Sequence, residues 1–220
     1  MALSIAVLIS GRGSNLAAIL RAIDAGQCNA MVRVVASDKR DAPGLELARA
    51  RGIATVVVRP REHADRAAWD AALADAIAAH APEFVVLAGF MRVVGRSFLD
   101  RFPRRVINLH PSLLPAFPGA HGPADAIAAG VRISGCTVHV VDAGVDTGPI
   151  IAQAAVPVLD GDDANALHAR IQVAEHQLLP HVIDGIARGV IRITPEVRVP
   201  APSTNEPSIL YSLPTASRPT

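Results

Sequence analysis

The chain has 220 residues, half of them hydrophobic, and a formal net charge of +1 at neutral pH. This length suits one domain with a sizeable core, or one domain with a small appendage. The near-neutral charge argues against capture of nucleic acid or of an anionic membrane as the main function. No apolar stretch approaches the roughly 18 residues that a membrane span needs.

Two cysteines, Cys28 and Cys136, stand far apart in the sequence and form no C-x-x-C pair. A cysteine-based zinc site or a redox motif is therefore not expected. We interpret the two residues as reduced thiols of a cytoplasmic protein. The first residues have no basic leader and run into a Gly-rich turn, which favours a first strand over a signal peptide.

Short β-branched runs alternate with longer Ala- and Arg-rich segments in the first half of the chain. We expect strands over residues 4–10, 32–37, 54–58, 84–89 and 105–110. The segments between them predict helices over 15–25, 43–52 and 63–80. This alternation predicts an α/β fold with a mostly parallel, Rossmann-like open sheet and helices on both faces.

The pattern changes after residue 120. We expect a helix over 121–130, two strands over 134–142 and 149–158, a long helix over 163–188 and a last strand over 189–193. The two strands and their glycine-containing connection predict an antiparallel C-terminal hairpin. Pro180 is expected to kink or restart the long helix. Residues 1–193 are thus one domain, and residues 194–220, rich in Pro, Ser and Thr, are expected to form a disordered tail.

The segment GRGSN, residues 11–15, lies between the first strand and the first helix. Glycines permit the turn, Ser14 and Asn15 can cap the helix, and free amides at a helix N-terminus favour an anion. Leu16 replaces the third glycine of a dinucleotide fingerprint, and the lysine of a P-loop is missing. A simple phosphate site and a purely structural turn both remain open.

Asn108 and His110 end the fifth predicted strand, two residues apart, so their side chains point the same way. In a parallel sheet they lie at the edge where ligands bind. Asn offers a neutral donor to a developing oxyanion, and His exchanges protons near neutral pH. The prolines that follow, including Pro111, Pro115 and Pro118, stiffen the loop.

A histidine that acts as a base often has a carboxylate beside it, and Asp142 and Asp146 lie in the glycine-flanked hairpin loop. Such a residue can equally be a turn former. His139 is either a hydrogen-bonded core residue or part of a site. The histidines of the helical segments, His63, His80, His168, His176 and His181, are interpreted as surface residues. No clustered ligand set for a metal is evident.

Four segments together resemble the glycinamide ribonucleotide formyltransferases of purine biosynthesis: VLISGRGSNL, VVLAGFMRVV, NLHPSLLPAFPG and DAGVDTGPIIAQ. The resemblance covers about residues 4–193. It implies 10-formyltetrahydrofolate as co-substrate, glycinamide ribonucleotide as substrate, and no metal, nucleic acid or membrane partner. The oligomeric state stays open, with a homodimer among the alternatives.

The same resemblance implies roles for single residues. Asn108, His110 and Asp146 match the catalytic trio, Gly13, Ser14 and Asn15 match the phosphate loop, and Glu175 matches a substrate contact. The folate contacts that it implies are Arg66, Met91, Arg92, Val93, Val94, Asn108 and Asp142. It also implies a cis bond between Leu114 and Pro115. The roles of Arg12, His121 and His139 are left unassigned.

These residue types suit a formyl transfer in which the substrate amine attacks the formyl carbon on N10 of the folate. Asn108 and a protonated His110 would stabilise the tetrahedral oxyanion, and His110 would help move the proton toward N10. Asp146 would stabilise the charged ring and hold its orientation.

Three other functions share part of this pattern. Methionyl-tRNA formyltransferases share the HPSLLP loop but add an RNA-binding domain. Formyltetrahydrofolate hydrolases add an N-terminal regulatory domain. A non-catalytic nucleotide-binding module would explain the Gly-rich turn but not Asn108, His110 and Asp146.

Overall fold

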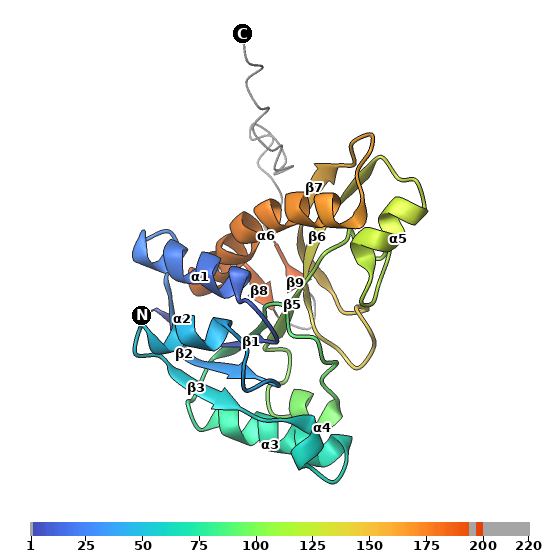
Figure 1. Ribbon diagram of the computed structural model, residues 1–220. Coiled ribbons are helices and arrows are strands. Elements are labelled where there is room, and N and C mark those ends of the chain that lie inside the picture. Colours follow the sequence, from blue (N-terminus) through green and yellow to red (C-terminus); the bar gives the residue numbers. More distant parts are fainter. Residues whose placement is uncertain (1, 194–196, 200–220) are drawn as a thin grey trace.

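A computed structural model describes residues 2–193 and 197–199 of the chain (Figure 1). Its first half contains β1 (Leu3–Ile9), α1 (Ser14–Asp24), β2 (Ala30–Ser37), α2 (Gly44–Arg49), β3 (Ala54–Val57), η1 (Pro60–Glu62), α3 (Arg66–Ala78), β4 (Phe84–Leu87), α4 (Arg96–Leu99) and β5 (Val106–His110). Its second half contains α5 (Gly122–Ala128), β6 (Ile133–Val140), β7 (Ile150–Pro157), α6 (Ala164–Ala187), β8 (Arg192–Ile193) and β9 (Val197–Arg198).

The sheet has seven strands in the order β3-β2-β1-β4-β5-β6-β7. The strands β1 to β5 pair in parallel, whereas β5, β6 and β7 pair antiparallel. The predicted mostly parallel sheet and the antiparallel hairpin are therefore confirmed. The strand order reverses between β1 and β4, and in such sheets ligands bind outside the carboxyl ends of the strands at this point.

Alternate residues of β1 enter two separate cores, which shows that both faces of the sheet are covered. Ile5, Val7 and Ile9 belong to one hydrophobic cluster with residues of α1, α2 and α6. Ala6 and Leu8 belong to the other cluster, with residues of α3 and the short α4. A strand that is apolar on both sides is the pattern of a parallel sheet between two helical layers.

The long helix α6 continues through Pro180 without restarting. Proline lacks the N–H that would bond four residues back, yet Pro180 is buried in the helix face that packs on the sheet. The packing of this face stabilises the helix by more than the missing hydrogen bond destabilises it. The expectation of a restart at this residue was therefore wrong.

Near the end of the described residues, Val197–Arg198 pairs antiparallel with Arg192–Ile193. The rest of the predicted tail, residues 194–196 and 200–220, lies outside the described residues. No helix in the described ranges is both long and apolar enough to cross a membrane.

Candidate active site

Two adjoining cavities lie at the carboxyl edge of the sheet, where the strand order reverses. The polar cavity, about 210 Å³, is lined by residues 10–15 and by residues of α6. The apolar cavity, about 270 Å³, is lined by residues 89–94, by the end of β5 and by the hairpin loop. Their linings share Gly89, Met91, Leu109 and Pro111, so the two cavities meet at the ends of β4 and β5.

The Gly-rich turn forms one wall of the polar cavity. Gly13 has a left-handed φ of 74°, and a Cβ at this residue would lie 2.9 Å from Cα of Gly44. Gly13 is the residue that precedes α1, and no side chain caps the helix. The first amides of α1 are thus free of a side-chain cap, rather than bonded to Ser14 or Asn15 as expected. Such amides favour an anion.

Residues of α6 form the opposite wall of the polar cavity. His168, Gln172 and Glu175 follow one another at spacings of four and three residues, which places them on one face of the helix. Only Glu175 had been singled out from the sequence. Gln172 and His168 lie three and seven residues before Glu175, and this helical spacing could have identified them as residues of the same face.

His63, His80, His168 and His176 are half-buried rather than exposed, so the surface interpretation was wrong for these four, whereas His181 is exposed. Burial together with the charge of Arg12 lowers the pKa of His168. Arg12 itself lines the polar cavity. A neutral His168 beside a cationic Arg12 offers one hydrogen-bonding ring and one positive charge to a ligand.

Glu175 is buried and forms no ion pair with the residues that the structure describes. Its Oε2 accepts a hydrogen bond of 3.1 Å from Nδ2 of Asn15, while Oδ1 of Asn15 is buried with no partner among the same residues. Burial raises the pKa of Glu175, and the bond from Asn15 only partly opposes this. Burial of these two groups with too few hydrogen bonds lowers the free energy of unfolding. A polar ligand that bonds to them would restore it.

The end of β5 places Asn108 and His110 on the wall of the apolar cavity, as the strand period predicted. His139 of β6 lies directly opposite Asn108 in the antiparallel register. Its ring is 2 % exposed, and its Nε2 lies 3.1 Å from Nδ2 of Asn108. His139 is therefore a residue of the site, although the sequence left its role open.

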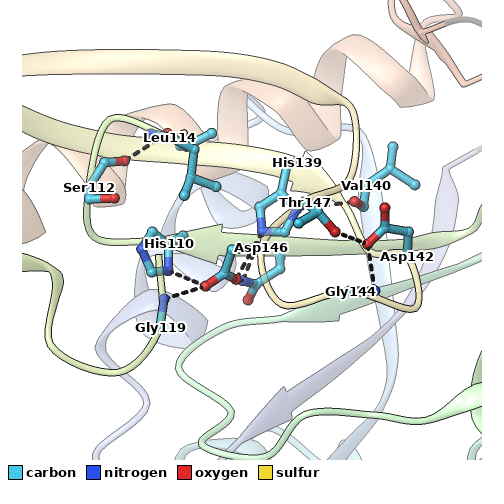
Figure 2. A network of polar contacts seen from close by, with 12 residues as sticks. His110, Ser112, Leu114, Gly119, His139, Val140, Asp142, Gly144, Asp146 and Thr147 are labelled. Atoms are coloured by element: carbon cyan, nitrogen blue, oxygen red, sulfur yellow. Dashed lines mark hydrogen bonds and ion pairs between the residues drawn. The ribbon is translucent and has the colours of Figure 1, made fainter. Parts of the chain in front are cut away.

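Asp146 joins three segments of the chain at this wall (Figure 2). Its Oδ2 lies 3.3 Å from Nδ1 of His110 and accepts a 2.8 Å bond from the amide of Gly119. Its Oδ1 lies 3.5 Å from both Nδ2 of Asn108 and Nε2 of His139. Burial acts to raise the pKa of Asp146, but His139, the Gly119 amide and His110 outweigh it, so the pKa lies below its ordinary value. Asp146 is thus ionised across the neutral range.

Both ring nitrogens of His110 face oxygen atoms that accept hydrogen bonds. Nδ1 faces the carboxylate of Asp146, and Nε2 lies 2.9 Å from the carbonyl oxygen of Phe117. A neutral imidazole has one N–H and can satisfy only one of these acceptors, whereas the imidazolium donates to both. A protonated His110 would therefore have one acceptor for each of its two N–H groups.

Hydrogen bonding also sets the tautomer of a neutral His139. Nδ1 lies 3.1 Å from the carbonyl oxygen of Val140, which can only accept. In the neutral ring the proton therefore sits on Nδ1, and Nε2 accepts from Nδ2 of Asn108, whereas only the doubly protonated ring can donate from Nε2 toward Asp146. The second N–H of the Asn108 amide keeps only the 3.5 Å contact with Asp146.

The remaining predicted contacts fall into two groups. Met91, Arg92, Val93 and Val94 line the apolar cavity, and the Leu114–Pro115 bond is cis. Asp142 does not line it, because its Oδ1 accepts from the Gly144 amide and the Thr147 hydroxyl within the loop (Figure 2). Arg66 lies outside both linings, at 3.3 Å from Asp70 and over the ring of Trp69.

Among the described residues, no three His, Cys, Asp or Glu side chains are grouped so that they could hold a metal ion. The site that the structure brings together consists of Asn108, His110, His139 and Asp146. These side chains offer N–H donors to a developing oxyanion, and a path for one proton.

The chain matches the family model described as formyl transferase over residues 3–183. It is 51% identical over 181 residues to the phosphoribosylglycinamide formyltransferase of Mycobacterium tuberculosis (strain H37Rv), with 82% of this chain and 83% of that protein covered. It is 44% identical over 191 residues to the phosphoribosylglycinamide formyltransferase of Escherichia coli (strain K12), with 87% and 90% covered. The crystal structure of glycinamide ribonucleotide transformylase 1 from Symbiobacterium toebii superposes with a TM-score of 0.87 at 48% identity, over 90% of this chain and 94% of that one.

The buried Glu175 predicts a pH-dependent stability difference for Glu175→Gln. In strong acid the carboxyl is protonated in both the folded and the unfolded chain. As the pH rises, the unfolded carboxyl ionises first and the folded one keeps its proton, because burial raises its pKa. The free energy of unfolding of the wild type should therefore fall, relative to that of Glu175→Gln, as the pH rises above about 4.

Urea unfolding of both proteins between pH 4 and pH 8 measures this difference. The Gln side chain has nearly the same volume as that of Glu and can still accept a hydrogen bond from Nδ2 of Asn15. The substitution therefore removes the ionisable group and keeps the packing. A difference that stays constant over this range would contradict a raised pKa for Glu175.

Proposed function

The chain belongs to the formyl transferase family, and we propose that it transfers the formyl group of 10-formyltetrahydrofolate to the amine of glycinamide ribonucleotide. This reaction is a step of de novo purine biosynthesis. The observation that carries the proposal is that the polar and the apolar cavity meet at Gly89, Met91, Leu109 and Pro111. Two substrates bound in these cavities would present their reacting ends to each other beside Asn108 and His110.

The polar cavity suits the ribonucleotide. Its phosphate would bind the free amides at Gly13, Ser14 and Asn15, where the helix dipole of α1 also favours negative charge. Glu175 would accept hydrogen bonds from the polar groups of the ribonucleotide, and Oδ1 of Asn15 would find the partner that it lacks. Arg12 and His168 extend the same wall with one charge and one hydrogen-bonding ring.

The apolar cavity suits the flat ring system of the folate. Its walls include Leu87, Phe90, Val94, Val141 and Val145. Arg92 lies at its margin and would face the carboxylates at the other end of the cofactor. Asp142 would contribute by fixing the shape of the hairpin loop that closes the cavity.

The formyl transfer would take place at the wall formed by β5 and β6. The amine nitrogen bonds to the formyl carbon, a tetrahedral intermediate forms, and the bond from that carbon to N10 breaks. The second N–H of Asn108 and the charged ring of His110 stabilise the oxyanion, and the proton released by the amine reaches N10 through His110. The carbonyl oxygen of Phe117 lies 2.9 Å from Nε2 of His110, and the substrate oxygen would take its place as the acceptor.

His139 acts in this scheme as a positioning residue. By accepting from one N–H of Asn108, its Nε2 turns the nitrogen, and not the oxygen, of the amide toward the reacting atoms. An amide turned the other way would present a second oxygen to the oxyanion and repel it. The orientation of a donor before the reaction starts is what gives such a site its effect.

The proposal places the reaction in the cytoplasm, which fits the free, buried thiols of Cys28 and Cys136. Both substrates are small molecules. Asn108, His110, His139 and Asp146 all come from the same chain.

A direct assay tests the reaction. We expect the purified protein to release tetrahydrofolate from 10-formyltetrahydrofolate only when glycinamide ribonucleotide is added, because the ribonucleotide supplies the attacking amine. Folate release is followed by absorbance, and the formylated ribonucleotide by mass spectrometry. Release without the ribonucleotide would indicate a hydrolase, and absence of release with saturating substrates would indicate a binding module.

Replacing the charged pair should remove the reaction. His110→Ala and Asp146→Asn should each lower kcat by about 100-fold or more, since loss of one oxyanion donor commonly costs 10²–10³. Circular dichroism should show an intact fold, because the residues of both hydrophobic cores are unchanged. Near-normal turnover of either purified variant would remove both residues from the catalytic role.

Replacing His139 should lower kcat with little change in KM for either substrate. We expect His139→Leu to lose about tenfold or more, because Asn108 is no longer held in one orientation. His139→Gln should recover part of the loss, since its amide oxygen can accept from Nδ2 of Asn108. If the Gln variant is as slow as the Leu variant while both stay folded, the acceptor role of His139 is excluded.

A further inference from the structure

The segment between β4 and α4 forms much of one wall of the apolar cavity. Residues 89–94 line this cavity, and neither they nor residue 95 belong to a helix or a strand. Because such a segment has no backbone ladder of its own, its shape depends on the neighbouring elements to which it is bonded. We call residues 89–95 the cavity loop.

The first half of the cavity loop is held by two neighbours. Ser10, which follows β1, donates from its amide to the carbonyl oxygen of Gly89 at 3.0 Å, and its hydroxyl accepts a 2.8 Å bond from the amide of Met91. The ring of Phe90 stacks on the buried ring of Trp69 of α3, with the two ring centroids 6.3 Å apart. Contacts with β1 and α3 therefore fix the loop as far as Met91.

The end of the cavity loop is bonded to the side chain of Asp70. Oδ2 of Asp70 accepts a 3.0 Å hydrogen bond from the amide of Gly95. Asp70 lies near the start of α3, and α3 packs beside α4, which follows the loop (Figure 1). The residue is only 2 % exposed, so water does not compete for this bond. A hydrogen bond to a charged acceptor is also stronger than one between neutral groups.

Stability alone does not account for a carboxylate at residue 70. Oδ1 of Asp70 is buried with no hydrogen-bond partner in the described part of the chain, and Nε of the half-exposed Arg66 lies 3.3 Å from Oδ2. Such burial lowers the free energy of unfolding, and an apolar side chain would avoid this cost. The contact also requires a glycine, because a Cβ at Gly95 would clash with Oδ2 of Asp70. What the carboxylate provides is the bond to the cavity loop.

We propose that Asp70 is a positioning residue for the co-substrate, which holds the end of the cavity loop in the shape that binds the folate. The inference rests on the proposed function, since it takes the folate as the occupant of the apolar cavity. A loop that is fixed before binding loses less conformational entropy when the ligand binds, so the affinity for the folate depends on this bond. The lining of the polar cavity includes only Gly89 and Met91 of the loop, so the affinity for the ribonucleotide does not depend on it.

Steady-state kinetics of variants on both sides of the contact test the proposal. Asp70→Leu removes the acceptor, and Gly95→Ala places a Cβ where Oδ2 lies. Each should raise the KM for 10-formyltetrahydrofolate about tenfold and leave kcat and the KM for the ribonucleotide within about twofold of the wild type. Asp70→Asn should restore the folate KM to within about twofold, because its side-chain oxygen can still accept from the Gly95 amide. Asp75→Leu is the matched control, since Asp75 is an exposed residue of the same helix that pairs with Arg101 at 2.8 Å.

Two measurements need no turnover. Amide hydrogen exchange of residues 89–95 should be faster in Asp70→Leu and Gly95→Ala than in the wild type and in Asp75→Leu, and calorimetry with tetrahydrofolate should show the same order of affinities as the KM values.

Unchanged exchange of the cavity loop in both variants would overturn the proposal. An equal rise of both KM values, or a rise of the folate KM in Asp75→Leu, would show a general effect of α3 and would also overturn it. Folate affinities in the expected order without formyl transfer would contradict only the proposed function, whereas a wild type that binds no tetrahydrofolate would overturn both.

Discussion

The carboxylate of Asp146 is the point at which the catalytic wall is assembled. It contacts His110 on β5 and His139 on β6, and it accepts from the Gly119 amide of the proline-rich loop. Asp146 adopts a left-handed φ of 55°, which is uncommon for a residue with a side chain. The antiparallel turn from β6 to β7 is what brings this residue back to the end of β5. Without that reversal of the sheet direction, Asn108 and His110 would have no carboxylate beside them.

The site holds two groups in states that do not favour folding. Within the described part of the chain, the buried Glu175 forms no ion pair and Oδ1 of Asn15 has no hydrogen-bond partner. Two hydrophobic cores, one on each face of the sheet, offset these costs. The cores use ordinary aliphatic packing, while the unfavourable groups are confined to the carboxyl edge. The packed cores therefore support the site, and the polar groups without partners lie where a ligand can bind to them.

Patterns within one segment could be read from the sequence, whereas pairings between segments could not. Asn108 and His110 share a side because strand residues alternate, and the Gly-rich turn follows from its glycines. The place of His139 depends on the register of β6 against β5, and a shift of one residue would turn it away. His168 and Gln172 join the site only because α6 packs beside α1. Asp142 matched a family position, but its local bonds to Gly144 and Thr147 direct its carboxylate into the loop.

The polar and the apolar cavity meet at the carboxyl edge of the sheet, and this arrangement has a mechanistic consequence. The free amides of α1 line the polar cavity and Arg92 lines the apolar one, and the reacting atoms would meet where the two linings join, at the ends of β4 and β5. Charged groups at the far ends of both substrates could then be held by strong contacts that take no part in bond making. Such remote contacts can orient the amine and the formyl carbon without binding either reacting atom tightly in its ground state. The N–H groups of Asn108 and His110 remain available for the one charge that appears only in the transition state, on the formyl oxygen.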